Sequence, residues 1–248
     1  MDKIQILRKI SQTFFFIYFV FLVNFCLCFF GILEKIILKG TIGQIIFKLV
    51  GIVFLTLIFG RVFCGWICPL GFLFELSYKL RAKLFKIKKL STVDEKIHNK
   101  LKYLKYIIFI VSLILTYHFS TYVYCQVCPI GFLTNLHGTV LSFIIFITFI
   151  IASFFIPMAF CRYFCPLGAF LSIFSIKPLF QLKTTEKCNK CRLCSFKCPM
   201  QIKIAEKIDQ KECIRCFECK SACRKKALSF STVFDIKSFK NKLDLKDH

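Results

Sequence analysis

The sequence is poor in acidic residues, and one long stretch has no charge at all. Of its 248 residues only 13 are Asp or Glu, against 36 Lys or Arg, and no charged residue lies between Tyr106 and Cys161. Nucleic-acid binding is a common reason for a basic chain, but no nucleic-acid motif accompanies the basic residues, so we expect no nucleic-acid partner. A hydrolytic constellation is also missing. The uncharged stretch instead indicates segments that lie in lipid.

Apolar runs long enough to cross a bilayer core of about 30 Å occur four times. They are residues 10–33, 42–63, 106–124 and 139–160. No small-residue cleavage site follows the first run, so it is expected to be a helix and not a signal peptide. The predicted fold is a mainly α membrane protein with four transmembrane helices. The expected domains are 1–183 (membrane), 184–230 (a small α+β domain) and 231–248 (polar tail).

Charge predicts how these runs are oriented. Residues 61–105 hold eleven Lys or Arg and three acids, and the stretch from Lys177 onward holds eighteen basic and eight acidic residues. Basic loops stay on the cytoplasmic side of a membrane. We therefore expect a multi-pass protein of the bacterial inner (cytoplasmic) membrane, with both termini cytoplasmic and lipid among its partners.

The sequence has 16 Cys, in a chain too long for a small secreted disulfide scaffold. Eight of them form two runs spaced C-x2-C-x2-C-x3-C, the spacing of bacterial two-cluster ferredoxins, in which the fourth Cys of each run binds the other cluster. Residues 184–230 are therefore predicted to be a small cytoplasmic α+β ferredoxin domain of the bacterial two-cluster type, with two [4Fe–4S] clusters. One would be bound by Cys188, Cys191, Cys194 and Cys223, and the other by Cys213, Cys216, Cys219 and Cys198. A pair of zinc knuckles is the alternative.

Another four cysteines occur in a short repeat at the ends of two apolar runs. FCGWICPLG at residues 63–71 matches FCRYFCPLG at residues 160–168. Both copies are predicted at the cytoplasmic side, where four thiols would converge. Four thiolates suit a [4Fe–4S] cluster or tetrahedral zinc, and beside a ferredoxin domain we favour a third cluster, with an inert structural role as the alternative. The predicted ligands are Cys64, Cys68, Cys161 and Cys165, and Arg61 and Arg162 are expected to offset their charge.

A looser copy of the repeat contains Cys125 and Cys128 and is predicted on the outer side, near Cys26 and Cys28. Three interpretations remain open: a disulfide or thiol-exchange pair, ligands of a further cluster, or packed thiols. Polar residues on the same side would accept the protons that a quinol releases on oxidation, or would anchor the helix ends. No catalytic group is assigned, and the candidates are Cys125, Cys128, His118, His137 and Glu34.

Taken together, the order of the apolar runs, the CxxxCP repeats and the paired ferredoxin motifs resemble the NapH family of membrane polyferredoxins. The segments that carry the resemblance are VFCGWICPL at 62–70, CPLGA at 165–169 and KCNKC at 187–191. The resemblance implies an electron-transfer subunit of the quinol dehydrogenase type, which passes electrons to another ferredoxin-like or reductase subunit. The outer pair Cys125 and Cys128 departs from the pattern of the nitrate-reduction members and indicates a variant with its own outer chemistry.

The predicted function is therefore an integral membrane iron–sulfur protein that relays electrons between the quinone pool and a redox partner in an anaerobic respiratory reductase system. Whether the chain is itself an enzyme stays open at this stage. The first alternative is a maturation factor that reduces a metal centre, for instance of an oxidase, during assembly. The second is a transmembrane thiol–disulfide electron carrier that uses Cys125 and Cys128.

Overall fold

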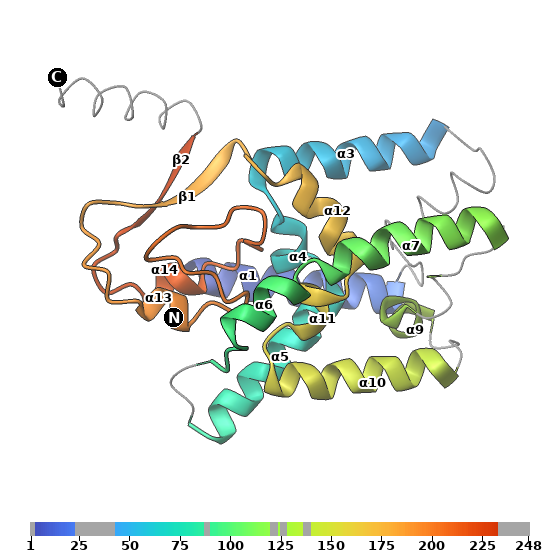
Figure 1. The fold of residues 1–248 in the computed structure, drawn as a ribbon, viewed down its shortest axis with the longest axis horizontal. Coiled ribbons are helices and arrows are strands. Elements are labelled where there is room, and N and C mark those ends of the chain that lie inside the picture. Colours follow the sequence, from blue (N-terminus) through green and yellow to red (C-terminus); the bar gives the residue numbers. More distant parts are fainter. Residues whose placement is uncertain are drawn as a thin grey trace.

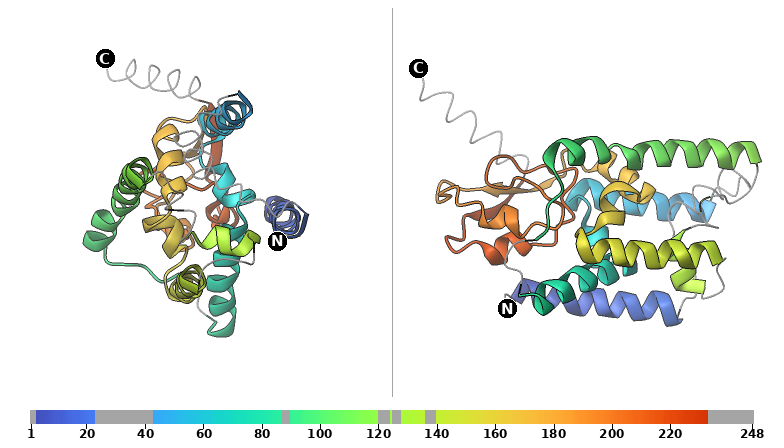
Figure 2. Two further views of the ribbon diagram at one scale, coloured as in Figure 1. Left: turned by 90° about the vertical axis from the view of Figure 1, so that its right-hand side faces the viewer. Right: turned by 60° about the horizontal axis from the view of Figure 1, so that its bottom comes forward.

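Long helices extend from one side of a small cysteine-rich domain in the computed structural model, which describes residues 3–22, 43–86, 90–119, 124, 128–135 and 140–232. The long apolar helices are α1 (Lys3–Ile17, continued by the π-helical turn η1, Tyr18–Leu22), α3 (Gly43–Phe59), α7 (Leu104–Phe119) and α10 (Val140–Phe155). They extend to the same side, away from the domain, in the right-hand view of Figure 2, and the left-hand view looks along them. Figure 1 shows the domain at the opposite end of the molecule from their free ends.

Large apolar side chains cover the outside of these helices. Phe14, Phe54, Ile110 and Phe143 are all exposed. By length and composition, two helices of the described residues are able to cross a membrane, Lys3–Phe21 and Glu95–Phe119, and two shorter apolar helices are Val50–Phe59 and Val140–Phe155. The mainly helical prediction is confirmed, whereas the crossing of a membrane by four helices stays a prediction. The first helix begins at Lys3, earlier than expected, and residues 23–33 of that run lie outside the described part.

Two helix–turn–helix units are built by the CxxxCP repeat. In one, α4 (Val62–Trp66) is followed by α5 (Pro69–Leu84), and in the other, α11 (Ala159–Tyr163) is followed by α12 (Pro166–Phe174). In each unit the second Cys has extended backbone and precedes a proline at the first helical position, where a missing N–H costs nothing. Both copies of the repeat thus have the same local backbone: a short helix, an extended Cys, and a second helix that begins with proline.

Shorter helices complete the helical half of the molecule. They are α6 (Glu95–Leu101), capped by the Asp94 carboxylate, and α9 (Pro129–Asn135). Contacts place α9 between η1, α5 and α10, and the closest helix pairs are α5 with α10 and α7 with α12. Buried aromatic rings fill the space between them, including Phe74, which packs against Phe160.

The cysteine-rich domain has one antiparallel pair of strands and two short helices. Strand β1 (Phe180–Thr184) pairs with β2 (Leu228–Thr232), so that Leu182 lies opposite Phe230. The helices are α13 (Leu193–Phe196) and α14 (Glu218–Ala222). Helix α12 ends at Phe174, and the chain becomes extended from Phe180, before the expected start of the small domain at residue 184.

Left-handed backbone conformations repeat between the two cysteine runs of this domain. Arg192 and Phe217 each have positive φ and directly precede α13 and α14. Lys190 and Arg215 form a second equivalent pair, one residue before the second Cys of each run. The two runs therefore fold as copies of each other, as expected from their identical spacing.

Candidate metal centres

A cavity inside the small domain is lined by the four cysteines that were assigned to one cluster. Cys198, Cys213, Cys216 and Cys219 line it. Most of the remaining lining is apolar, including Leu182. The first cysteine run contributes one of these thiols and the second run contributes three, which is the crossed arrangement that the spacing predicts.

Burial makes these thiols poor acids. Burial and then the nearby thiol of Cys213 raise the pKa of Cys198 to about 11. Burial also raises the pKa of Cys216 and of Cys219. A buried thiol of this kind loses its proton when a metal group binds to the sulfur in place of the proton. The cavity therefore has the thiol ligands and the apolar lining that suit a bound cluster.

The other four cysteines of the domain lie nearer to solvent. Cys191 is exposed, Cys188 and Cys223 are partly buried, and Cys194 on α13 is buried. A backbone hydrogen bond from the Thr185 nitrogen to the Ala227 oxygen (2.8 Å) brings the chain before Cys188 beside the chain after Cys223. The Cys223 sulfur also accepts a hydrogen bond from the Ala227 nitrogen (3.3 Å). Hydrogen bonds to sulfur help to set the potential of iron–sulfur clusters.

The membrane quartet, which we define as Cys64, Cys68, Cys161 and Cys165, comes together where the two CxxxCP turns meet. Burial, followed by the nearby thiols of Cys64 and Cys68, raises the pKa of Cys165 to about 12. The pKa of Cys161 is raised by burial first and then by each of the other three thiols. The structure thus gathers four thiols, which the sequence placed 97 residues apart in two pairs.

Close approach explains the glycine that both copies of the repeat share. A Cβ on Gly71 would lie 2.6 Å from the Cys64 carbonyl oxygen, and one on Gly168 would lie 3.3 Å from the Cys161 carbonyl oxygen. Each helix that follows a Cys-Pro pair therefore packs onto the carbonyl of the first Cys of its own copy. The Cys165 sulfur accepts a hydrogen bond from the Gly168 nitrogen (3.3 Å) in the same turn.

Arg61 carries the positive charge nearest to the membrane quartet. Its side chain is fully buried, and Nη1 donates to Glu212 Oε2 at 3.0 Å. Within the described residues, Nε and Nη2 have no hydrogen-bond partner. A Cβ on Gly168 would lie 2.7 Å from Nη2, which places the guanidinium against the Cys165 turn. Two buried donors without partners are costly, and an anionic group held by the quartet would satisfy them.

Arg162 is placed differently from the expectation that it flanks the quartet with Arg61. It donates to the side-chain oxygen of Gln201 in the small domain and to the Pro157 carbonyl oxygen. The turn of the second CxxxCP copy is thus tied to the segment that follows Cys198.

The loop around Cys213 and Cys216 sits directly on the first CxxxCP turn. Trp66 Nε1 donates to the Arg215 carbonyl oxygen at 2.9 Å, and Arg215 Nε donates to the Phe59 carbonyl oxygen at 3.1 Å. Lys105 from α7 and Arg61 both pair with Glu212, the residue before Cys213. The membrane quartet and the cavity of the small domain are therefore joined by a packed, hydrogen-bonded interface.

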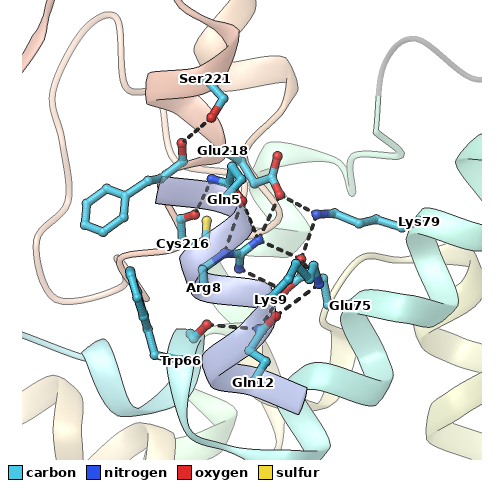
Figure 3. Close-up of polar contacts among 12 residues, drawn as sticks. Gln5, Arg8, Lys9, Gln12, Trp66, Glu75, Lys79, Cys216, Glu218 and Ser221 are labelled. Carbon is cyan, nitrogen blue, oxygen red and sulfur yellow. Dashed lines mark hydrogen bonds and ion pairs between the residues drawn. The ribbon is translucent and has the colours of Figure 1, made fainter. Parts of the chain in front are cut away.

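Helix α1 is fastened to the same loop by a buried network of charges (Figure 3). Arg8 pairs with Glu75 of α5 at 2.7 Å and with Glu218 of α14 at 2.9 Å. Gln5 Nε2 donates to the Cys216 carbonyl oxygen at 2.9 Å. Burial alone would raise the pKa of Glu75, but Arg8, Lys79 and Lys9 outweigh it and lower the pKa to about 2.

Sequence reasoning missed Glu75 and its partners. The available signal was that Glu75 is the only acidic residue between Arg61 and Asp94 and lies within residues 69–76, which are otherwise apolar. A lone carboxylate in such a run indicates a buried ion pair, but the identity of Arg8 as its partner depends on tertiary contacts.

A single-ion geometry is absent from the described residues, where no three Cys, His, Asp or Glu side chains are arranged to hold one metal ion. Zinc bound by four thiolates would need sulfurs only about 3.8 Å apart, because the Zn–S bond is about 2.3 Å. A cubic iron–sulfur cluster carries its ligands on separate iron atoms and accepts a wider spacing. Four thiols in an apolar cavity are a donor set that a [4Fe–4S] cluster uses.

The outer candidates are only partly described. Cys128 is buried beside Ile130, directly before α9, and His118 is exposed near the end of α7. Cys125, Cys26, Cys28, His137 and Glu34 lie outside the described residues, so the geometry of the outer pair stays a prediction.

Comparison with known proteins agrees with the repeat. The profile of a family described as "4Fe-4S binding domain" matches residues 42–88, 103–139 and 139–183, and each match contains one copy of the Cys-Pro motif. An uncharacterized protein of Methanocaldococcus jannaschii is 75% identical over 96% of this chain and 100% of its own length, and a second from the same organism is 52% identical over 93% and 89%. No solved structure matches.

A further relative connects the chain with the resemblance found in its motifs. The ferredoxin-type protein NapH of Haemophilus influenzae is 27% identical over 74% of this chain and 67% of its own length. Iron–sulfur electron transfer of the ferredoxin type is the activity that these relatives and the family profile support. The chain therefore belongs to the 4Fe-4S binding domain family and is a member of the NapH-type ferredoxin proteins.

Proposed function

We propose that this protein is a membrane electron-transfer subunit that holds three [4Fe–4S] clusters and connects a quinone pool with a partner redox protein. The observation that carries the proposal is the position of the membrane quartet. It lies where the apolar helices end, directly beneath the loop that contributes Cys213 and Cys216 to the cavity of the small domain.

The twelve proposed ligands form three sets. Cys188, Cys191, Cys194 and Cys223 would hold the first cluster, Cys198, Cys213, Cys216 and Cys219 the second, and Cys64, Cys68, Cys161 and Cys165 the third. When bound, a [4Fe–4S] cluster accepts and releases one electron at a potential set by its surroundings.

The chain's own residues provide those surroundings. Arg61 places a buried positive charge beside the membrane quartet, and Arg8 does the same on the Cys216 side. The buried positions of Cys161, Cys216 and Cys219 exclude water from the second and third ligand sets, which we call the inner sets. A positive charge stabilises the more negative, reduced state of a nearby redox group, so both arginines are expected to raise the potentials of the inner sets.

The membrane location is supported by the parallel apolar helices. Helices α1, α3, α7 and α10 would cross the bilayer, with the small domain on the cytoplasmic side as the basic loops predict. The ends of these helices that point away from the domain would lie at the outer side of the membrane. Among the residues that the structure describes, His118 near the end of α7 is the candidate to accept a proton from quinol there.

Reduction by quinol tests this function. The protein in lipid nanodiscs is mixed anaerobically with a reduced menaquinol analogue, and cluster reduction is followed by low-temperature electron paramagnetic resonance. Wild type and Cys128→Ser should both be reduced, while Cys165→Ser should lose the signal of the membrane set and reduce the small domain at least tenfold more slowly. The burial of Cys128 makes it a poor exchange thiol. Loss of quinol reduction in Cys128→Ser alone would instead favour the thiol–disulfide carrier.

A further inference from the structure

Basic side chains crowd the end of the small domain that faces away from the apolar helices. The loop from β1 to α13 and the loop from α14 to β2 form this end in Figures 1 and 2. Residues 186–192 and 224–226 contain six basic residues and one acid, Glu186, all of them exposed. The basic residues are Lys187, Lys190, Arg192, Arg224, Lys225 and Lys226. We call these two segments the basic face.

Both segments belong to one surface. The Thr185 nitrogen donates to the Ala227 oxygen at 2.8 Å, so the residues that follow Thr185 lie beside those that precede Ala227. Arg192 pairs with Glu206 at 3.1 Å. Elsewhere in the described part of the chain, the other five cations of the basic face form no ion pair with a carboxylate. Their charges are therefore directed into solvent.

The basic face surrounds the most accessible of the cluster ligands. Cys191 is the one exposed cysteine among those described, and Leu193, which follows it closely, is also exposed. By contrast, Cys216 and Cys219 are buried towards the membrane half. Electron transfer between proteins needs the redox group near the contact surface, and an apolar centre with a charged rim is typical of such contacts.

We infer that the basic face is the docking surface for an acidic redox protein, which exchanges electrons with this chain at the Cys191 edge. The inference rests on the proposed function. A lipid surface does not fit, because the basic face lies on the end of the small domain that faces away from the apolar helices, and so away from the bilayer that they would cross. Complementary charge acts mainly on the rate of encounter, which it raises by about 10- to 1,000-fold at low salt.

Two small acceptors of opposite charge test the inference. The detergent-purified protein is reduced with dithionite, freed of excess reductant and mixed in a stopped-flow instrument with acidic plastocyanin or with basic cytochrome c. In each reaction one electron leaves the protein and reduces one Cu(II) to Cu(I), or one haem Fe(III) to Fe(II), with no proton transferred. The compared variants are the double substitution Lys187→Glu with Lys225→Glu, and a matched control, Lys83→Glu with Lys177→Glu, whose lysines are exposed outside the basic face.

The rate constant for plastocyanin at about 10 mM salt should fall at least tenfold in the first variant, and the rate for cytochrome c should rise. The control should change each rate less than about threefold. For each acceptor, the rates of wild type and of both variants should converge at about 0.5 M salt, where charges are screened within roughly 4 Å. An unchanged plastocyanin rate in the first variant, or an equal loss in the control, would overturn the inference. The inference would also be overturned if the basic face bound DNA or anionic vesicles while its substitution left the plastocyanin rate unchanged.

Iron quantitation before the kinetics separates the two levels of the account. A purified chain without iron would overturn the proposed function together with this inference. A chain that holds iron and reduces both acceptors, but whose rates ignore the charge of the basic face, would overturn the inference alone.

Discussion

The contact between Gly65 and the small domain offers a sharp test of the interface. A Cβ on Gly65 would lie 2.2 Å from the Ile214 carbonyl oxygen, whereas ordinary van der Waals contact begins near 3.4 Å. Both atoms belong to backbone that cannot rotate away. Gly65→Ala therefore has to separate α4 from the loop around Cys213 and Cys216 by about 1 Å, and this lengthens the hydrogen bond from Trp66 to Arg215.

The expected cost follows from overpacking, which destabilises by about 1–3 kcal/mol. For a chain of this size that corresponds to a fall in melting temperature of roughly 2–12 °C. Gly51→Ala is the matched control, because it makes the same chemical change on α3 where a Cβ would meet nothing within 4 Å. In a helix that change is expected to be neutral or to stabilise by about 0.5–1 kcal/mol.

The assay combines thermal melting of the detergent-solubilised protein with amide hydrogen exchange. Gly65→Ala should melt earlier than wild type, and the amides of residues 212–217 should exchange faster, whereas Gly51→Ala should leave both unchanged or improved. If Gly65→Ala is as stable as Gly51→Ala and exchange at 212–217 is unaltered, the small domain does not sit on the first CxxxCP turn as described.

Three further predictions concern single side chains. Cys198→Ser should remove the cluster of the second cysteine run and spare that of the first; loss of the opposite signal in electron paramagnetic resonance would contradict the crossed assignment. Arg61→Gln should lower the reduction potential of a cluster bound by the membrane quartet by on the order of 100 mV in a redox titration. Arg61→Lys, which keeps the positive charge, should retain most of the wild-type potential. An unchanged potential in Arg61→Gln would show that the charge of Arg61 does not act on this cluster. The pKa of Glu75 is lowered from 4.5 to about 2, so the stability that its ion pairs contribute is complete above pH 4.5 and is lost as the pH falls towards 2. Amide exchange of α1 should show that wild type loses about 3 kcal/mol of stability over that range, while Glu75→Gln, already less stable at pH 7, should lose less. An equal pH dependence of the two proteins would refute this role of Glu75.

The ligand sets stay predictions, whereas the two CxxxCP turns were predictable from the sequence because their spacing is a local property. The repeat at 63–71 and 160–168 predicted two equivalent turns, and each folds with a proline-started helix packed on the carbonyl of its first Cys. Periodicity and apolar runs also predicted the helices α3, α7 and α10. What these features share is that a few neighbouring residues determine them.

The contacts between the two halves were not predictable in this way. Arg8 meets Glu218 across 210 residues, and Trp66 meets Arg215 across 149. Strand β1 illustrates the same limit, since its five residues pair with Leu228–Thr232 far along the chain and alone look like the end of an amphipathic helix. The docking of the small domain on the membrane half is decided by such long-range contacts, and only the folded structure places them.

Iron and acid-labile sulfide in the anaerobically purified protein measure the central claim most directly. Three occupied sets predict about 12 iron and 12 sulfide per chain, falling to about 8 of each in Cys165→Ser. A wild-type value of about 8 that Cys165→Ser leaves unchanged would contradict the assignment of the membrane quartet, and zinc in place of iron would contradict the account as a whole.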